Sequence, residues 1–336
     1  MIQAWFRHAC VALSVGALML VTPNVASAEP VSSISRIEVE SARTVIAHVY
    51  SASMDRVVRL RVRTPADTSE PRPTLYLLNG AGGGDGQATW DARTDVDEFF
   101  ADKNVNVVTP LDGSFTYYTD WERDDPALGR NKWTTFLTQE LPPIIDEQFR
   151  TSGGVNAIAG LSMSGTSVLS LAIAAPTLYR AVGGLTAVAP KRARSWGGNC
   201  TSGRWWRAAG EADAENMWGT STAGMAANDP YVNADKLRGI DLYISSATGL
   251  PGGPHENLGA RSVENDPGLL LNQIVVGGVI EAAVDACTHR LAARLDELGI
   301  PARFEFRSRG THSWGLLAGR SAQFVADDRA CVGGVA

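Results

Sequence analysis

A serine placed between a short apolar strand and a helix constrains the fold of this chain more than any other feature. The apolar run Val155 to Ala159 predicts a strand, and the small-residue-rich stretch Ser164 to Ala175 predicts a helix that stops at Pro176. Ser162 lies in the short connection between them. A strand that turns directly into a helix is typical of a parallel sheet, with the turn at one edge of that sheet.

The residues around Ser162 indicate a nucleophile elbow. The tight turn of such an elbow exposes the serine hydroxyl and leaves room only for small side chains two positions before and after it, here Gly160 and Ser164. The pattern is Gly-x-Ser-x-Ser rather than Gly-x-Ser-x-Gly, so a serine-rich helix N-cap is the alternative interpretation. The strand before Ser162 and the helix after it favour the nucleophile.

Short apolar strands alternate with helices along the rest of the chain. This order predicts an α/β-hydrolase fold, with a mostly parallel central sheet, helices on both faces and a long insertion over the active site. The insertion is 189–238, which is rich in Gly, Ser, Trp, Asn and Asp. Further predicted strands are Val57 to Thr64, Thr74 to Leu78, Val105 to Thr109, Val182 to Val188, Ile240 to Ser246 and Ala302 to Phe306; predicted helices are Leu137 to Phe149 and Ile280 to Leu298.

The first 28 residues have the pattern of a secretory signal peptide, with Arg7, the apolar run Cys10 to Val21 and the cleavage site Ala26-Ser27-Ala28. A retained anchor is the alternative, but a bilayer needs roughly 20 apolar residues. No later stretch is expected to span a membrane. We therefore expect one secreted or cell-envelope catalytic domain over 29–336.

Charge and cysteine content exclude some classes of protein. The chain has 30 basic and 36 acidic residues, a formal net charge of −6, and nothing in it indicates nucleic-acid binding. After removal of Cys10, the cysteines are Cys200, Cys287 and Cys331, which suit one disulfide and one free thiol in an oxidising compartment. The pairing is open, and without Cys-x-x-Cys spacing we expect no metal site.

A serine hydroxyl needs a histidine base, itself oriented by an acid. His312 follows the last predicted strand, in Gly310-Thr-His312-Ser-Trp314, where this fold delivers its base. His48 precedes the first predicted core strand, His255 lies in a Gly-Pro-rich loop and His289 lies in a predicted helix. The chain order serine, acid, histidine leaves six candidates for the acid, and spacing does not choose among them: Asp241, Glu256, Glu264, Asp266, Glu281 and Asp285.

Acyl transfer also needs backbone N–H groups aimed at the oxyanion, and the fold supplies them from the residue after the nucleophile and from an earlier loop. Met163 and Ala81 occupy those positions. The glycine run after Asn79 could instead indicate a phosphate cradle, but it lacks the Gly-Lys-Ser/Thr ending of a P-loop. An oxyanion loop is the favoured interpretation.

Several segments together resemble the antigen 85 family of mycolyltransferases, and more closely its corynebacterial-type relatives. They follow the family's order over most of the mature chain: Leu77-Leu-Asn-Gly-Ala-Gly-Gly-Gly84, Trp90-Asp91, Asn104-Val-Asn-Val-Val-Thr-Pro110, Ser114-Phe-Thr-Tyr-Tyr-Thr-Asp-Trp121, Lys132-Trp-Thr-Thr-Phe-Leu-Thr-Gln-Glu-Leu-Pro142, Gly160-Leu-Ser-Met163, Asn228-Asp-Pro230 and Gly310-Thr-His-Ser-Trp314.

The resemblance implies roles for individual residues. It places the nucleophile at Ser162 and the base at His312, and it selects Glu281 as the acid. It also implies oxyanion donors on Ala81 and Met163, and a trehalose contact at Trp314. One loop departs from the family, since Asn79-Gly-Ala-Gly82 replaces Asp-Gly-Leu-Arg; Asn79 remains a candidate substrate contact because its amide can donate and accept.

The function that the resemblance implies is transfer of a mycolyl group from trehalose monomycolate to trehalose or cell-wall arabinogalactan through an acyl-enzyme, with no cofactor. A secreted serine carboxylesterase is the alternative enzyme, and an inactive wall-binding module is the alternative outside enzymes.

Overall fold

The computed structural model describes residues 30–185, 213–219, 222–253 and 255–316. Two compact units divide the chain, Met1–Pro30 and Val31–Ala336, and the fold described here is that of the second. The predicted signal segment 1–28 lies outside the described residues, as do Cys200, Cys331 and the start of the predicted insertion.

The described strands form one nine-stranded sheet in the order β1-β2-β3-β5-β4-β6-β7-β8-β9. From β5 to β9 all neighbours pair in parallel, whereas β1, β2, β3 and β5 pair antiparallel. The strands are β1 (Ser33–Val39), β2 (Thr44–Ser51), β3 (Arg56–Arg63), β4 (Arg72–Leu78), β5 (Asn106–Pro110), β6 (Thr151–Leu161), β7 (Tyr179–Leu185), β8 (Asp241–Ala247) and β9 (Arg303–Arg307).

The mostly parallel sheet predicted from sequence is confirmed, and it carries an antiparallel edge that the sequence did not predict. Strands β1 and β2 were missed because β1 alternates apolar residues with charged ones and is exposed along most of its length. His48 therefore lies inside a strand rather than before the first one, and its Nε2 is 3.0 Å from Glu38 Oε1.

The helices and helical turns are α1 (Trp90–Arg93), α2 (Val96–Phe99), α3 (Trp133–Thr135), the π-helical η1 (Phe136–Glu140), α4 (Leu141–Phe149), α5 (Met163–Ala174), α7 (Ala214–Trp218), α8 (Thr222–Ala227), the 3₁₀ turn η2 (Ala234–Leu237) and α9 (Pro267–Glu297). The predicted helix Leu137 to Phe149 is helical throughout, but its first turn belongs to the π-helical η1 and the rest to α4, and α3 precedes it.

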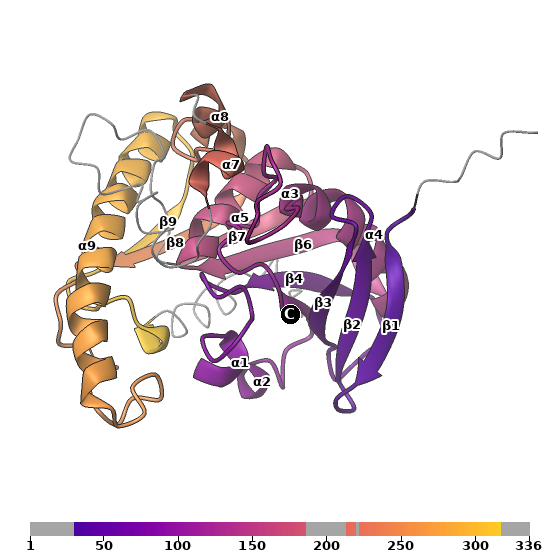
Figure 1. The fold of residues 1–336 in the computed structure, drawn as a ribbon, viewed down its shortest axis with the longest axis horizontal. Helices are drawn as coiled ribbons and strands as arrows, with labels where there is room; N and C mark the ends of the chain where they lie inside the picture. The colour runs from indigo at the N-terminus through magenta and orange to yellow at the C-terminus, as the bar shows by residue number, and fades with distance from the viewer. Residues whose placement is uncertain (1–29, 186–212, 220–221, 254, 317–336) are drawn as a thin grey trace, which may run out of the picture. The chain divides into compact units, whose positions relative to one another are not determined.

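Both faces of the sheet are buried, which explains why its central strands are continuous apolar runs. On β4, Tyr76 and Leu78 belong to one hydrophobic cluster, and Leu75 and Leu77 to another. The first cluster includes side chains of α4 and α5, and the second those of α1 and α2. Helices therefore cover both faces, α5 on one side and α1 and α2 on the other (Figure 1).

Helix α9 corrects two predictions. It begins 13 residues before the predicted Ile280, because Asp266 caps its N-terminus with Oδ1 accepting from Gly268 N at 2.6 Å, and Pro267 is compatible with the first turn. An apolar stretch of 18 residues within this helix has a mean hydropathy of 1.5, and 17% of that stretch is buried. By length and composition α9 could cross a membrane, so the expectation that no later stretch is long and apolar enough was wrong; a core helix of a soluble protein passes the same test.

Cys287 is fully buried in α9 and is disulfide-bonded, in agreement with the expected disulfide. The described end of the predicted insertion is helical and packs on the loop after β5. Asp125 in that loop accepts hydrogen bonds from Asn216 Nδ2 at 3.0 Å and from Asp213 N at 3.1 Å. The ring of Trp218 packs on the ring of Tyr117, with the two ring centroids 5.3 Å apart. Trp196, Trp205 and Trp206 lie outside the described residues.

Candidate active site

Ser162 lies in a strained turn at the carboxyl end of β6. Its φ is 57° and its ψ is −118°, in a region that side chains other than glycine rarely adopt. A Cβ on Gly160 would lie 2.6 Å from Ser164 Oγ and 2.7 Å from Ser164 O, so only glycine fits there. Ser164 replaces the usual second glycine because its buried hydroxyl has a place in the turn, where it accepts from Leu161 N at 2.9 Å.

Ser162, His312 and Glu281 form one hydrogen-bonded chain. The Nε2 atom of His312 is 2.8 Å from Ser162 Oγ, and its Nδ1 atom is 3.0 Å from Glu281 Oε2. An ionised carboxylate can only accept, so its hydrogen bond requires Nδ1 to carry the proton of a neutral imidazole. Nε2 is then the free acceptor that a serine nucleophile needs.

Glu281 has no solvent exposure, and both of its carboxylate oxygens have partners. Oε1 accepts from Ala247 N at 2.9 Å, at the carboxyl end of β8, while Oε2 faces His312. One turn earlier in α9, the Gly277 carbonyl accepts from His312 N at 3.2 Å. A Cβ on Gly277 would lie 3.3 Å from that nitrogen. Helix α9 therefore fixes both the ring and the backbone of His312.

The other acids named from sequence have different partners. Asp285 accepts from Ser246 Oγ at 2.5 Å, Asp266 caps α9, and Glu264 pairs with Arg93. Asp241 is exposed at the start of β8. Of the six candidates, Glu281 is the one that hydrogen-bonds His312.

Glu256, also named from sequence, supports the loop that carries His312. Its carboxylate accepts from Thr311 N at 2.6 Å and from Gly253 N at 3.0 Å. Burial raises the pKa of this carboxyl, but the hydrogen bonds from Thr311, Gly253 and Gly252 outweigh burial and hold the pKa below its ordinary value. The spacing of Glu256 from Ser162 and His312 in the sequence gave no indication that it supports this loop.

The remaining histidines are not arranged as a base for Ser162. His289 stacks on Phe306, with ring centroids 3.8 Å apart, and its Nε2 lies 3.7 Å from Asp285. His255 packs closely on Gly315, where a Cβ would lie 2.4 Å from its ring.

The two residues expected to donate to the oxyanion, Met163 and Ala81, lie in the segments on either side of Ser162. Met163 is the first residue of α5, so its N–H has no acceptor within the helix. Gly80 lies against the elbow from the β4 side, since a Cβ there would be 3.6 Å from Ser162 Cβ. The next residue, Ala81, accepts from Phe115 N at 2.8 Å through its carbonyl, which anchors this loop.

The glycine run after Gly80 packs against the loop that follows β5. A Cβ on Gly83 would lie 2.0 Å from Ser114 N, and one on Gly84 would lie 2.6 Å from Leu111 Cα; both residues have positive φ. These glycines are required for close backbone packing, which agrees with the preference for an oxyanion loop over a phosphate cradle.

The loop after β5 was not predicted to lie beside the nucleophile. Phe115, Tyr117 and Tyr118 all have positive φ, and Tyr117 N contacts Met163 Sδ at 3.4 Å. Burial raises the pKa of the Tyr118 hydroxyl well above its ordinary value. This loop therefore borders the turn that carries Ser162, through Met163 and through the hydrogen bond from Phe115 N to Ala81 O. In the sequence, the aromatic residues of this loop were the available indication that it lies near the site.

The structure corrects the expected substrate contact at Asn79. This side chain has no solvent exposure; its Nδ2 donates to Pro110 O at 3.0 Å and its Oδ1 accepts from Trp90 N at 3.1 Å. Asn79 therefore braces β4, β5 and α1 and does not face a ligand. Trp314 is half-buried, with its ring edge-on to Trp90 at 5.7 Å.

Within the residues that the structure describes, no group of three or more His, Cys, Asp or Glu side chains is arranged to hold a metal ion. The chemistry that this geometry can perform is covalent catalysis by serine: a hydroxyl, a base in contact with it, and a buried acid behind the base.

Comparison with known proteins identifies the family. A family model described as "Putative esterase" matches residues 51–317. Diacylglycerol acyltransferase/mycolyltransferase Ag85A of Mycobacterium leprae is 32% identical over 273 residues, which cover 79% of this chain and 76% of that protein. Ag85B of Mycobacterium avium, with the same activities in its name, is 30% identical over 278 residues, covering 79% and 76%.

Solved structures share the fold. MPT51 (FbpC1) of Mycobacterium tuberculosis superposes with a TM-score of 0.67 at 22% identity, covering 87% of this chain and 100% of that one. An S-formylglutathione hydrolase of Agrobacterium tumefaciens gives a TM-score of 0.59 at 15% identity, covering 90% and 100%. These two structures establish the α/β-hydrolase fold alone. On the family model and on the identity to the two mycobacterial relatives, the chain belongs to the putative esterases and, among them, to the antigen 85 family.

Proposed function

We propose that this chain is an acyltransferase of the cell envelope that moves a mycolyl group from trehalose monomycolate to trehalose or to cell-wall arabinogalactan. The observation that carries the proposal is the continuous hydrogen-bonded chain from Ser162 through His312 to the fully buried Glu281. The name of the Mycobacterium leprae relative, which includes mycolyltransferase, supports the acyl group. The export signal expected in 1–28 supports action outside the cytoplasm.

In the first half-reaction, Ser162 Oγ attacks the ester carbonyl while His312 Nε2 takes the hydroxyl proton. Negative charge develops on the carbonyl oxygen, and the backbone N–H groups of Met163 and Ala81 donate to it. His312 then gives the proton to the leaving sugar oxygen, which releases the free sugar and leaves the acyl group on Ser162.

In the second half-reaction, a sugar hydroxyl replaces water as the nucleophile. His312 deprotonates the acceptor hydroxyl, which attacks the acyl-enzyme and regenerates Ser162. Transfer outruns hydrolysis when the acceptor is held within reach of the base at a high effective concentration. Trp314 lies two residues after His312, and we propose its half-buried ring as one surface that holds the acceptor.

A secreted carboxylesterase is the second candidate function. The esterase description of the family model favours it, since the same three side chains can hand the acyl group to water. The departure of Asn79-Gly-Ala-Gly82 from the family pattern also favours it, because Asn79 is buried and the other three side chains offer no hydrogen bond to a sugar.

The deciding experiment incubates the mature protein with trehalose monomycolate and separates diester, free acid and acyl-enzyme by mass spectrometry. We expect diester to exceed free acid when trehalose is saturating, and Ser162→Ala to lose both products by about 10⁴ to 10⁶ in rate. Free acid as the main product at saturating trehalose and arabinan would establish the esterase instead. Unchanged turnover in Ser162→Ala would exclude both functions.

A further inference from the structure

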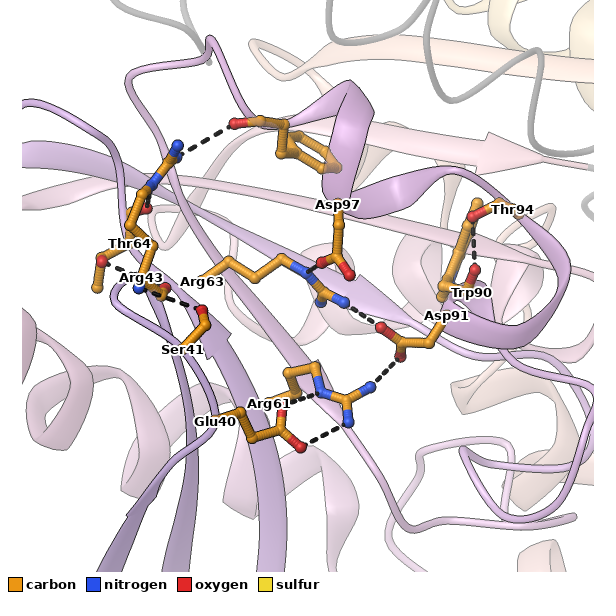
Figure 2. Close-up of polar contacts among 11 residues, drawn as sticks. Glu40, Ser41, Arg43, Arg61, Arg63, Thr64, Trp90, Asp91, Thr94 and Asp97 are labelled. Carbon is orange, nitrogen blue, oxygen red and sulfur yellow. Dashed lines mark hydrogen bonds and ion pairs between the residues drawn. The ribbon is translucent and has the colours of Figure 1, made fainter.

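A polar pocket lies outside the hydrogen-bonded chain of Ser162, His312 and Glu281, beside the antiparallel edge of the sheet. Its volume is about 440 Å³, within the range of small-molecule sites. Strands β2 and β3, the turn between β1 and β2, and the helices α1 and α2 line it. Figure 2 shows the side chains that meet there, with Arg61 and Arg63 of β3 on either side of Asp91.

Arg63 is the least accessible charge in this pocket. Its side chain is 6% exposed, its Nε donates to Asp97 Oδ1 at 2.5 Å, and its Nη2 pairs with Asp91. The Nη1 atom of Arg63 is buried and has no hydrogen-bond partner among the described residues. A buried guanidinium N–H without an acceptor is costly, so a ligand oxygen at this position would complete the set.

The charges around the pocket cancel. Three arginines (Arg43, Arg61 and Arg63) face three carboxylates (Glu40, Asp91 and Asp97). Arg61 is bound by Glu40 through two contacts of 2.9 Å and by Asp91 at 2.8 Å, which leaves little of its charge for an anion. A phosphate or carboxylate ligand would gain no net attraction in such a site and would meet three like charges.

Hydrogen-bond donors and acceptors both line the pocket. Ser41, Thr44 and Thr64 bring hydroxyls to its lining, Arg63 has the unpartnered Nη1, and the Asp97 side chain is 74% exposed with one oxygen available to accept. Sugar hydroxyls both donate and accept, so an electrically neutral lining with both kinds of group fits a polyol better than an ion or an acyl chain. Phe100 adds an apolar surface at the pocket wall.

One chain of packed residues links the lining of the pocket to the active site. Asp91 follows Trp90 in the sequence, and the ring of Trp90 packs on Trp314, two residues from His312. We propose that this pocket is a second carbohydrate subsite, which holds a remote unit of a saccharide acceptor; the link to the acceptor rests on the proposed function, whereas the binding itself does not.

The test is a binding measurement in the mature Ser162→Ala protein, with trehalose and an arabinofuranosyl hexasaccharide as probes, by calorimetry and saturation-transfer NMR. We expect Asp97→Asn to weaken hexasaccharide binding by about tenfold, the lower end of the effect of one lost hydrogen bond to a charged group. Thr44→Val, which removes a hydroxyl without changing shape, should weaken it in the same direction. Asp124→Asn is the matched control, because Asp124 is 59% exposed and pairs with Arg130 outside the pocket.

Three results would overturn the subsite: no saccharide binding, equal binding in Asp97→Asn and Asp124→Asn, or tighter binding of inorganic phosphate than of saccharide while Asp97 is intact. With Ser162 restored, Asp97→Asn should hydrolyse a small soluble ester as the wild type does. The two proposals can therefore fail separately. A wrong subsite is detected by the binding measurement, which needs no turnover, and a wrong function is detected by the products of the active enzyme.

Discussion

Replacing Glu281 by glutamine is the sharpest perturbation of the site, because it changes one atom of a fully buried group. The wild-type carboxylate accepts two hydrogen bonds, from Ala247 N at 2.9 Å and from His312 Nδ1 at 3.0 Å. An amide has one oxygen to accept and one NH₂ to donate. The two N–H groups that Glu281 serves therefore cannot both be satisfied by Glu281→Gln.

Two orientations of the new amide are possible, and both impair the site. If the amide oxygen stays on Ala247, the NH₂ group faces His312 Nδ1 and forces the ring into the tautomer with its proton on Nε2, which cannot then accept from Ser162. If the oxygen faces His312, the amide NH₂ and the Ala247 N–H oppose each other at a fully buried position, at a cost of about 1–3 kcal/mol. The backbone N–H cannot change its role whereas imidazole can, so the first orientation is favoured. A wrong tautomer costs about 10⁴ in kcat, or about 5.4 kcal/mol of transition-state stabilisation.

The assay is hydrolysis of p-nitrophenyl butyrate, with kcat and KM measured separately and thermal unfolding measured in parallel. Glu281→Gln should lose kcat with little change in KM and remain folded. Asp285→Asn and Asp266→Asn are the matched controls and should lose little, since Asp285 binds Ser246 and Asp266 caps α9. A Glu281→Gln enzyme within about tenfold of wild type, or an equal loss in Asp285→Asn, would refute the tautomer argument.

Three further changes test the surroundings of the site. Gly160→Ala should destabilise the fold by about 1–3 kcal/mol in chemical denaturation, because the new Cβ would lie 2.6 Å from Ser164 Oγ; an unchanged midpoint would contradict the packing. Glu256 has a lowered pKa when folded, so its hydrogen bonds to Thr311 and Gly253 stabilise the protein above the ordinary carboxyl pKa of about 4.3 and are lost as pH falls through the folded value. Glu256→Gln should accordingly lower the melting temperature at pH 7, with a difference from wild type that shrinks below pH of about 4; a constant difference would exclude the carboxylate as its source. Trp314→Ala should raise the ratio of hydrolysis to transfer, while a phosphonate should still label Ser162. Trp314→Phe is the control, because it keeps an aromatic ring against Trp90. An unchanged ratio in Trp314→Ala would show that Trp314 does not bind the acceptor.

The sequence predicted those parts of the fold whose signals are local. Central strands are apolar on both faces, so β4, β6 and β8 could be located within a few residues, and the turn at Ser162 is confined by its immediate neighbours. The exposed strand β1 has no comparable signal. The first half of α9 was missed for another reason, since Gly277 and Gly278 are poor helix formers by propensity. Tertiary contact with His312 and Gly249 explains why both are glycines.

The acid of the site could not be chosen from spacing, because its selection depends on three segments that meet only in the folded chain. The carboxyl end of β8 supplies the N–H of Ala247, α9 supplies Glu281, and the loop after β9 supplies His312. Parallel strands bring their carboxyl ends to one edge of the sheet, so strand order decides which acids reach His312. Asp285, one turn along α9, is close in sequence and binds Ser246 instead.

The loop after β4 is the place where physical chemistry separates this chain from its relatives. Asn79 is buried in hydrogen bonds to Pro110 and Trp90, and the glycines at 83 and 84 pack directly on the backbone of 111–114. The side chains of Gly80, Ala81 and Gly82 offer no hydrogen bond to a sugar. Sugar recognition in a transferase of this kind must then come from residues outside the loop. The lining of the neutral pocket around Arg63 has the side-chain donors and acceptors that the loop lacks. Exchanging residues 79–82 for Asp-Gly-Leu-Arg should therefore change hexasaccharide affinity less than Asp97→Asn does.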